Sequence, residues 1–181
     1  MEHEYYWYKN FFDKSACRTI SDFLKESVAD GSDSPAEAVS KKTKVKVVSW
    51  NKAKTLLHRV EDIVNYVNQR NFGFDIYQLT SQDFVNYNVY ESSNQGKYDW
   101  HKDSVLGKNY DLKLTAIVNI STEPYSGGDF ELFLNEPIKI KELSEPGSIL
   151  IFPSYFMHRV TEMISGRRET VSIWLHGPTF R

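Results

Sequence analysis

The sequence predicts a mainly β protein of the α+β class, in which helices near the N-terminus pack on one face of a β-sandwich or barrel. Two observations support this prediction. Apolar residues recur at helical spacing in the first third of the 181 residues, and from Asp83 onward they alternate with period two. No internal repeat or linker interrupts the chain. We therefore expect residues 1–181 to form one domain, with helical support over about 1–75 and the β core over about 76–181.

Two amphipathic segments predict the helices. The first starts after Asp13, a residue type that caps helix N-termini, and ends at the turn residues of segment 30–35. Its apolar stripe consists of Cys17, Ile20, Leu24 and Val28. The second starts near Asn51 and stops around Gly73, with a stripe of Leu56, Val60, Ile63 and Val67. Spacings of three and four residues put each stripe on one helix face, which can pack on the β core.

Short alternating segments separated by turn clusters predict the strands. We expect them over residues 83–91, 112–120, 129–134, 148–152 and 169–175. Between the two helices, residues 41–48 (KKTKVKVV) are interpreted as a lysine-rich loop that runs into a strand. Lysines commonly protect exposed strand edges, so we expect these lysines to form a solvated edge.

Composition excludes several classes of protein. The formal net charge is −2, from 22 basic and 24 acidic residues, so no global field attracts nucleic acid or an anionic membrane. Cys17 is the single cysteine, which excludes intrachain disulfides and thiolate-rich metal sites. No apolar run approaches the roughly 18 residues of a membrane span, and the N-terminal residues lack the order of a signal peptide. The expected location is the cytoplasm.

A histidine and an aspartate two residues apart carry the first chemical signal. His101 and Asp103 point to the same side of an extended segment, so both side chains can reach one point in space. If the strand of His158 faces this segment across a barrel, the three groups form a 2-His-1-carboxylate triad, as in non-haem Fe(II) oxygenases. The alternative is a surface histidine that lies near an aspartate by chance.

The position of Arg168 favours the metal site over that alternative. Arg168 follows His158 past the turn at 165–167, as expected for the next strand of a hairpin. Period two puts it on one face with Thr170, Ser172 and Trp174. An arginine that points into a barrel needs an anion, and a guanidinium pairs well with a carboxylate.

Two other interpretations of these residues are open. Arg168 could be a surface residue bound to Glu162 or Glu169, although Arg167 suits that exposed role better. Zn²⁺ also accepts two histidines and an aspartate, as in zinc hydrolases, but a hydrolase leaves an inward arginine unexplained.

Five stretches of the chain resemble a known family. They are residues 98–103 (YDWHKD), 125–130 (YSGGDF), 147–154 (GSILIFPS), 158–161 (HRVT) and 166–168 (GRR). In this order and spacing the chain is similar to the Fe(II)- and 2-oxoglutarate-dependent dioxygenases, particularly the prolyl 4-hydroxylase-like (PKHD-type) group. The resemblance covers about residues 84–175, whereas the N-terminal helices resemble the family's supporting helices only loosely.

The resemblance implies a double-stranded β-helix, or jelly roll. It implies that His101, Asp103 and His158 bind Fe(II) and that Arg168 holds the distal carboxylate of 2-oxoglutarate. O2 and 2-oxoglutarate are then cosubstrates, succinate and CO2 are products, and ascorbate is a candidate reductant. Related halogenases lack the carboxylate ligand, so the presence of Asp103 favours hydroxylation.

The resemblance also suggests secondary residues around the cosubstrate. Tyr90 matches a tyrosine that many relatives direct toward this pocket, Ser172 is a candidate donor to the carboxylate, and Trp174 is a candidate pocket wall. Asn119 lies, with Thr115, on the strand where relatives often place another cosubstrate-binding group. The alternative for Tyr90, Ser172 and Trp174 is ordinary packing in the core, and Asn119 stands near a position that is commonly tyrosine in animal prolyl hydroxylases.

The expected substrate is a peptidyl proline, and the expected partner is therefore a protein or peptide. The alternatives are a free amino acid or other small metabolite, and a jelly-roll module that binds metal without turnover. Residues 5–8 and Trp100 could line a peptide groove, and the loop around 30–44 could close over substrate, its lysines favouring an acidic one. No nucleic-acid or membrane partner is expected. The sequence leaves the oligomeric state open.

Overall fold

The computed structural model describes residues 3–30, 35–38, 40–103 and 110–180. In the first half of the chain the elements are β1 (Tyr6–Tyr8), α1 (Lys14–Glu26), β2 (Pro35–Ala38), β3 (Lys41–Ser49), α2 (Trp50–Val67), a π-helical turn (Asn68–Phe72) and β4 (Phe84–Glu91). They continue with a 3-10 turn (Ser92–Asn94), β5 (Lys97–His101), β6 (Asp111–Asn119), β7 (Ser126–Gly127), β8 (Phe130–Phe133) and β9 (Pro137–Lys139). The last are a 3-10 turn (Lys141–Ser144), β10 (Ile149–Pro153), β11 (Met157–Val160), β12 (Met163–Ser165) and β13 (Arg167–Gly177).

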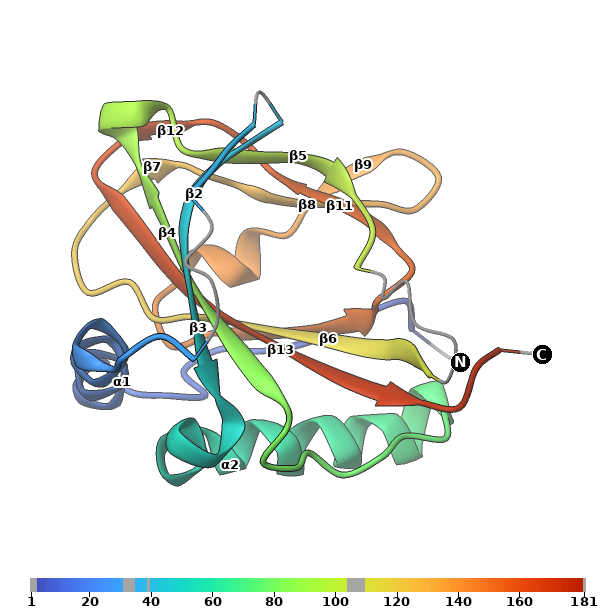
Figure 1. The fold of residues 1–181 in the computed structure, drawn as a ribbon. Coiled ribbons are helices and arrows are strands. Elements are labelled where there is room, and N and C mark those ends of the chain that lie inside the picture. The colour runs from blue at the N-terminus through green and yellow to red at the C-terminus, as the bar shows by residue number, and fades with distance from the viewer. Residues whose placement is uncertain (1–2, 31–34, 39, 104–109, 181) are drawn as a thin grey trace.

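These strands form one large antiparallel sheet that curls on itself. Its order is β1-β10-β6-β13-β4-β3-β5-β11-β8-β9, with β2 also paired to β3. Figure 1 shows the sheet as two layers, with β4, β13 and β6 below and β5, β11 and β8 above. This arrangement confirms the predicted fold class, a mainly β jelly roll with few helices.

In Figure 1 α2 runs beneath the lower layer, and α1 lies at its left side. Asp13 caps α1, because its carboxylate accepts a hydrogen bond of 2.7 Å from the backbone N–H of Ala16. The apolar faces of both helices join one core cluster with residues of β3, β4, β6, β10 and β13. Val28 is an exception to the predicted stripe. Since α1 ends at Glu26, Val28 lies outside the helix and is 78% exposed, so its assignment to the core was wrong.

A second apolar cluster fills the space between the two layers. It contains Tyr90, Ile117, Phe130, Leu132, Leu150, Phe152 and Val160, among others. Aromatic side chains such as Phe130 and Phe152, with ring centroids 5.6 Å apart, make up much of this cluster. Apolar side chains therefore pack along the inner face of the roll, and this packing supports the strands that carry the site.

The lysine-rich segment is a strand along its whole length, so the prediction that it begins as a loop was wrong. β3 pairs with β4 from Lys44 to Ser49, with β5 at Lys41 and Lys42, and with β2. From Val45 to Ser49 its ladder partner among the described strands is β4 alone, so this stretch has one open side, as in a strand edge. A strand of the main sheet thus falls within residues 1–75, which were expected to be helical support.

The five predicted strands are all present, but one connection differs. We expected Arg168 on a strand that forms a hairpin with the strand of His158. Instead, β13 pairs with β4 and β6, and the short β12, which pairs with β7, lies between β11 and β13. Gly166, with φ of +74°, makes the turn that sends β13 into the lower layer.

Among the described residues, the helices are too short or too polar to cross a membrane.

Candidate metal and cosubstrate site

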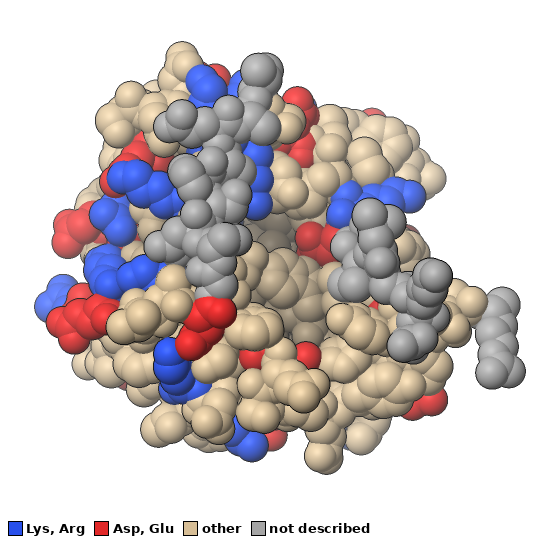
Figure 2. Space-filling model, viewed as in Figure 1, with Lys and Arg blue, Asp and Glu red and all other residues tan. Residues whose placement is uncertain are grey.

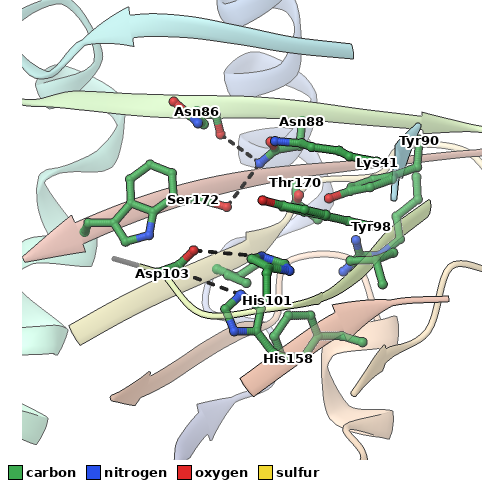
Figure 3. Close-up of a pocket in the computed structure, with 15 residues that line it drawn as sticks. Lys41, Asn86, Asn88, Tyr90, Tyr98, His101, Asp103, His158, Thr170 and Ser172 are labelled. Carbon is green, nitrogen blue, oxygen red and sulfur yellow. Dashed lines mark hydrogen bonds and ion pairs between the residues drawn. The ribbon is translucent and has the colours of Figure 1, made fainter. Parts of the chain in front are cut away.

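A cavity of about 170 Å³ lies between the two layers of the roll. Its walls come from β3, β4, β6 and β13 and from β5, β8 and β11. Figure 2 shows a hollow in the middle of the face seen in Figure 1. Figure 3 shows polar side chains from several strands directed into the same space. The cavity therefore unites residues that are far apart in the sequence.

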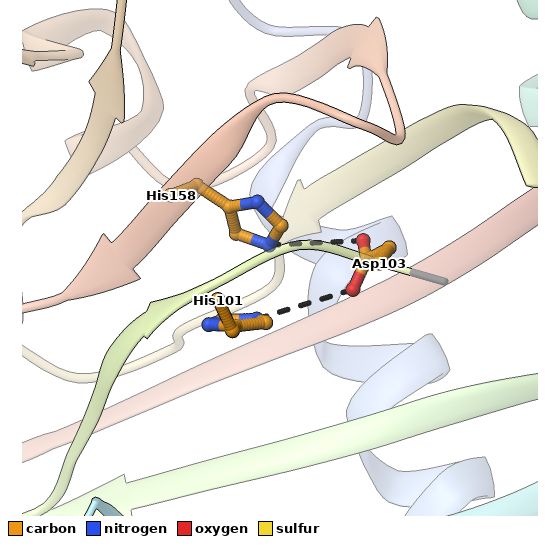
Figure 4. A group of neighbouring side chains, drawn as sticks. All are labelled: His101, Asp103 and His158. Atoms are coloured by element: carbon orange, nitrogen blue, oxygen red, sulfur yellow. Dashed lines mark ion pairs between the residues drawn. The ribbon is translucent and has the colours of Figure 1, made fainter. Parts of the chain in front are cut away.

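The three predicted metal ligands lie together in this cavity (Figure 4). Their donor atoms are all within 4.8 Å of one another. The Nε2 atoms of His101 and His158 lie 3.9 and 3.7 Å from the carboxylate oxygens of Asp103. We expected the strands of the two histidines to face each other across a barrel, but they do not. β5 and β11 are hydrogen-bonded neighbours, and His101 and His158 are direct partners in the ladder.

Backbone carbonyls orient both imidazoles. Nδ1 of His101 lies 2.7 Å from the carbonyl oxygen of Asp99, and Nδ1 of His158 lies 2.9 Å from that of Phe156. A carbonyl oxygen only accepts hydrogen bonds, so each Nδ1 carries the proton and each Nε2 presents its lone pair toward Asp103. Tyr98 further restrains His101, because the two rings stack with centroids 3.5 Å apart.

Asp103 is held from two sides. Its backbone N–H donates to the carbonyl of Ser154 over 3.1 Å, and its Oδ2 accepts a hydrogen bond of 2.8 Å from Thr115 Oγ1. The hydroxyls of Thr115 and Ser154 lie 2.9 Å apart. No sequence motif placed Thr115 beside this carboxylate. The resemblance had placed Thr115 only on the strand where relatives often have a cosubstrate-binding group, whereas its partner is the metal-ligand candidate Asp103.

Burial keeps His101 in the form that can bind a cation. Desolvation, and then the nearby charge of His158, lower the pKa of His101 to about 4. His101 is therefore neutral at pH 7, with its Nε2 lone pair available. Two imidazole nitrogens and one carboxylate oxygen on one side of a cavity are the donors that a divalent iron ion accepts in a facial triad. The residues present thus fit such an ion.

Arg168 provides a buried positive charge in the same cavity. Its side chain is 2% exposed, and its guanidinium carbon lies 5.6 Å from the centroid of the Tyr90 ring. Among the described residues it has no carboxylate partner. The interpretation of Arg168 as a surface residue bound to Glu162 or Glu169 was therefore wrong.

The neighbouring Arg167 has the surface role instead. Its guanidinium forms ion pairs with Glu169 at 2.6 Å and Glu91 at 3.6 Å. The two adjacent arginines point to opposite faces of β13, as period two requires. Within the described ranges Arg167 has anionic partners, whereas the inward-pointing Arg168 has none. A buried cation without an anionic partner is costly.

Ser172 and Trp174 line the cavity, as expected from their register, and Tyr90 lines it, as the resemblance suggested. Ser172 Oγ accepts a hydrogen bond of 3.1 Å from Asn88 Nδ2. The indole N–H of Trp174 is buried and has no hydrogen-bond partner in the described part of the chain. Asn86 and Asn88, which belong to no recognised motif, also line the cavity. Their alternation with Tyr90 along β4 was a signal that could have found them.

The structure places Asn119 outside this cavity. Its Nδ2 lies 2.8 Å from the carbonyl of Leu143 and 2.9 Å from the hydroxyl of Tyr125, and its Oδ1 accepts from the backbone of Ser121. These partners account for the amide group and anchor the connection before β10. We therefore leave Asn119 out of the proposed cosubstrate site.

Other candidate residues lie away from the cavity. Residues 6–8 form β1, which pairs with β10, and Trp100 packs against Phe133 and Arg159. His176 lies 3.4 Å from Asp83, and no further group of metal-binding side chains occurs among the described residues. Within the suggested substrate loop, residues 31–34 and 39 lie outside the described residues.

The comparison with protein-family models identifies this combination of fold and site. Residues 85–176, just over half of the chain, match the model of the 2OG-Fe(II) oxygenase superfamily. The chain belongs to this superfamily. This confirms the resemblance that the sequence motifs suggested, and the matched segment contains all four residues of the predicted iron and 2-oxoglutarate site.

Curated relatives of this superfamily member are PKHD-type hydroxylases. One from Synechococcus sp. is 32% identical over 91 residues, which are 48% of this chain and 40% of the relative. Another, from Crocosphaera subtropica, is 35% identical over 85 residues, 44% of this chain and 37% of the relative. The matches thus span about two fifths of the length of these relatives.

Solved structures share the fold over nearly the whole chain. A Pseudomonas putida prolyl-4-hydroxylase superposes with a TM-score of 0.76 at 16% identity, covering 98% of this chain and 95% of that one. The viral collagen prolyl hydroxylase of Paramecium bursaria Chlorella virus-1 gives 0.71 at 14% identity, covering 97% of both chains. At such low identity these similarities establish the fold alone.

Proposed function

We propose that the protein is a hydroxylase that depends on Fe(II) and 2-oxoglutarate. One observation carries the proposal. The buried Arg168, which has no carboxylate partner among the described residues, lines the same cavity as His101, Asp103 and His158. A metal site alone would not require such an arginine, whereas a dicarboxylate bound between the metal and the guanidinium uses both features.

The side chains have distinct roles in this proposal. Bound iron, with O2 and 2-oxoglutarate, supplies the oxidation of a C–H bond to an alcohol while 2-oxoglutarate is converted to succinate and CO2. His101, Asp103 and His158 would hold the metal through Nε2, a carboxylate oxygen and Nε2. Arg168 would bind the distal carboxylate of 2-oxoglutarate through two N–H donors. The enclosed apolar walls, including Ile117 and Phe130, would exclude water from the reacting groups.

A peptidyl proline is the substrate we favour. The relatives named PKHD-type hydroxylases and the prolyl-4-hydroxylase fold of the Pseudomonas putida protein support it. A neighbour from Trichoplax adhaerens was solved with a peptide fragment of a hypoxia-inducible factor, with a TM-score of 0.73. A small-molecule substrate is the second candidate, because a carbocyclase of nogalamycin biosynthesis shares the fold with a TM-score of 0.66.

Anaerobic titration of 2-oxoglutarate into the Fe(II)-loaded protein tests the cofactor assignment. We expect a visible metal-to-ligand charge-transfer band in the wild type. Substitution His101→Ala should abolish it, and Arg168→Met should weaken 2-oxoglutarate binding at least about tenfold, since a charge-assisted bidentate contact is lost. Arg167→Met removes the same charge from the opposite face of β13 and should leave the band unchanged. Folded, iron-loaded protein without a band would instead indicate a metal-binding module without turnover.

Mass spectrometry of candidate substrates tests the reaction. Incubation with Fe(II), 2-oxoglutarate, ascorbate and proline-containing peptides should add one oxygen atom to the peptide and release succinate. If a free amino acid is hydroxylated and no proline peptide is, the peptidyl assignment is refuted while the cofactor assignment stands.

A further inference from the structure

Lys41, the first residue of β3, brings a second cation to the cavity. It lines the same space as Arg168 and the three metal-ligand candidates. Its side chain is half-buried, and its Nζ lies 4.3 Å from the centroid of the Tyr98 ring. Tyr98 stacks in turn on His101. Figure 3 shows Lys41 beside Tyr98 in the cavity wall. The amino group is therefore two contacts away from the metal site.

The other lysines of β3 have polar partners, whereas Lys41 has none among the described residues. Lys42 donates to Gln95 at 3.0 Å, Lys44 pairs with Glu91 at 2.7 Å, and Lys46 donates to the carbonyl of Lys25 at 2.6 Å. Within the described part of the chain, the amino group of Lys41 meets only the face of Tyr98. Burial lowers the pKa of Lys41, although Asp103 acts in the opposite direction. A partly desolvated cation without an anion is a ready binding site for one.

The charges in the cavity leave Lys41 unmatched. Asp103 is the one carboxylate among the described lining residues, and it is directed toward His101 and His158. If the proposed function holds, the divalent metal is balanced by dianionic 2-oxoglutarate, and Asp103 balances Arg168. One positive charge, on Lys41, remains in a partly dehydrated site. Electrostatic complementarity then favours a negative group on the remaining ligand, which is the substrate.

We propose that Lys41 binds a carboxylate of the substrate and so selects for carboxylate-bearing substrates. This proposal rests on the proposed function and narrows its substrate class. The sequence suggested that lysines of residues 30–44 favour an acidic substrate. The structure assigns this role to Lys41 alone. The carboxylate can belong to an acidic residue next to the hydroxylated residue of a peptide, or to a free acid.

Matched pairs of ligands test the proposal by binding rather than turnover. The peptide pair is acetyl-Gly-Asp-Pro-Gly-amide and its Asn analogue, and the free-acid pair is L-proline and L-prolinamide. Calorimetry uses protein loaded with Mn(II) and 2-oxoglutarate. With Mn(II) in place of Fe(II), the protein binds the test ligands without turning them over. We expect the wild type to bind the carboxylate member of one pair about tenfold more tightly than its amide twin. The pair that shows the preference identifies the source of the carboxylate.

Variants of two adjacent lysines assign the preference to a side chain. Lys41→Met keeps an unbranched chain over Tyr98 but removes the charge, so it should abolish the preference, whereas Lys41→Arg should retain it. Lys42→Met makes the same charge change at the next residue and should also retain it. Thermal unfolding confirms that each variant is folded, and Lys41→Gln replaces Lys41→Met if the latter is not.

The possible outcomes separate this proposal from the proposed function. Equal binding within both pairs by the wild type, or a preference that survives Lys41→Met, overturns the role of Lys41 while 2-oxoglutarate binding still stands. The affinity for 2-oxoglutarate should change less than about twofold in Lys41→Met. A loss as large as in Arg168→Met would assign Lys41 to the cosubstrate instead. Failure of the wild type to bind 2-oxoglutarate would refute the proposed function itself.

Discussion

At the scale of single residues, the site depends on side chains that hold the ligands as well as on the ligands. The carboxylate of Asp103 lies in a segment just after β5, where the backbone has one hydrogen bond to Ser154. Thr115 reaches it from β6 with a hydrogen bond of 2.8 Å. Such supporting contacts fix the orientation of a ligand before the metal binds, which lowers the entropic cost of binding.

We therefore expect Thr115→Val to weaken Fe(II) binding by about tenfold to a hundredfold, the usual cost of losing a hydrogen bond that orients a metal ligand. Thr115→Ser keeps the hydroxyl and should restore most of the affinity. Anaerobic Fe(II) titration followed by calorimetry measures both, and thermal unfolding checks that the two variants have similar stability. Equal affinity in the wild type and Thr115→Val would show that the Asp103 carboxylate needs no such support.

At the scale of elements, tight turns between strands set which residues enter the cavity. Gly147 precedes β10 and has φ of +81°. Its backbone bonds to two distant segments, as its N–H donates to the carbonyl of Asn119 at the end of β6 and its carbonyl accepts from the N–H of Phe12 before α1. A Cβ at this position would overlap the carbonyl oxygen of Phe12. This turn therefore requires glycine both for its dihedral angles and for space.

A comparison of two glycines separates these effects. Gly73, at the end of the π-helical turn, has φ of +69°, but a Cβ added there would meet no atom within 4 Å. Gly73→Ala should lower the free energy of unfolding by about 1 kcal/mol, the cost of the left-handed conformation. Gly147→Ala should cost at least about 2 kcal/mol more, because backbone must also move. Urea denaturation measures both, and equal losses would contradict the steric argument.

At the scale of the whole molecule, burial affects weak acids both in the cavity and elsewhere in the fold. Burial raises the pKa of Tyr87 and of Tyr90 to about 12, and that of the Cys17 thiol to about 11. Each of these hydroxyl or thiol groups therefore holds its proton more tightly in the folded protein than in the unfolded chain. The contribution of each group to the free energy of unfolding is complete at pH values below its pKa in the unfolded chain. This contribution is lost as the pH rises through the pKa of the group in the folded protein.

The free energy of unfolding should therefore fall between about pH 9 and pH 12, with each buried tyrosine contributing about 2 kcal/mol. Tyr87→Phe should make this decline shallower. Tyr77→Phe is the matched control, because Tyr77 is 44% exposed, and it should leave the slope unchanged. Urea denaturation at several pH values gives these slopes. A parallel decline in the wild type and Tyr87→Phe would rule out this tyrosine as a cause.

Local spacing determined most elements of this protein and the direction of their key side chains. Period two was sufficient to place His101 and Asp103 on one side and Arg168 on the face of Ser172 and Trp174, because side-chain direction in a strand depends on position alone. The same rule predicted the five main strands, and capping by Asp13 predicted the start of α1.

Only the tertiary structure decided which strands are neighbours. The pairing of β5 with β11, the insertion of β13 between β4 and β6, and the inclusion of β3 in the sheet depend on contacts between distant segments. Such pairings follow from how the whole sheet buries its apolar face, which no local pattern encodes. For the same reason the roles of Thr115 beside Asp103 and of Lys41 above Tyr98 emerged only once the sheet had curled around the cavity.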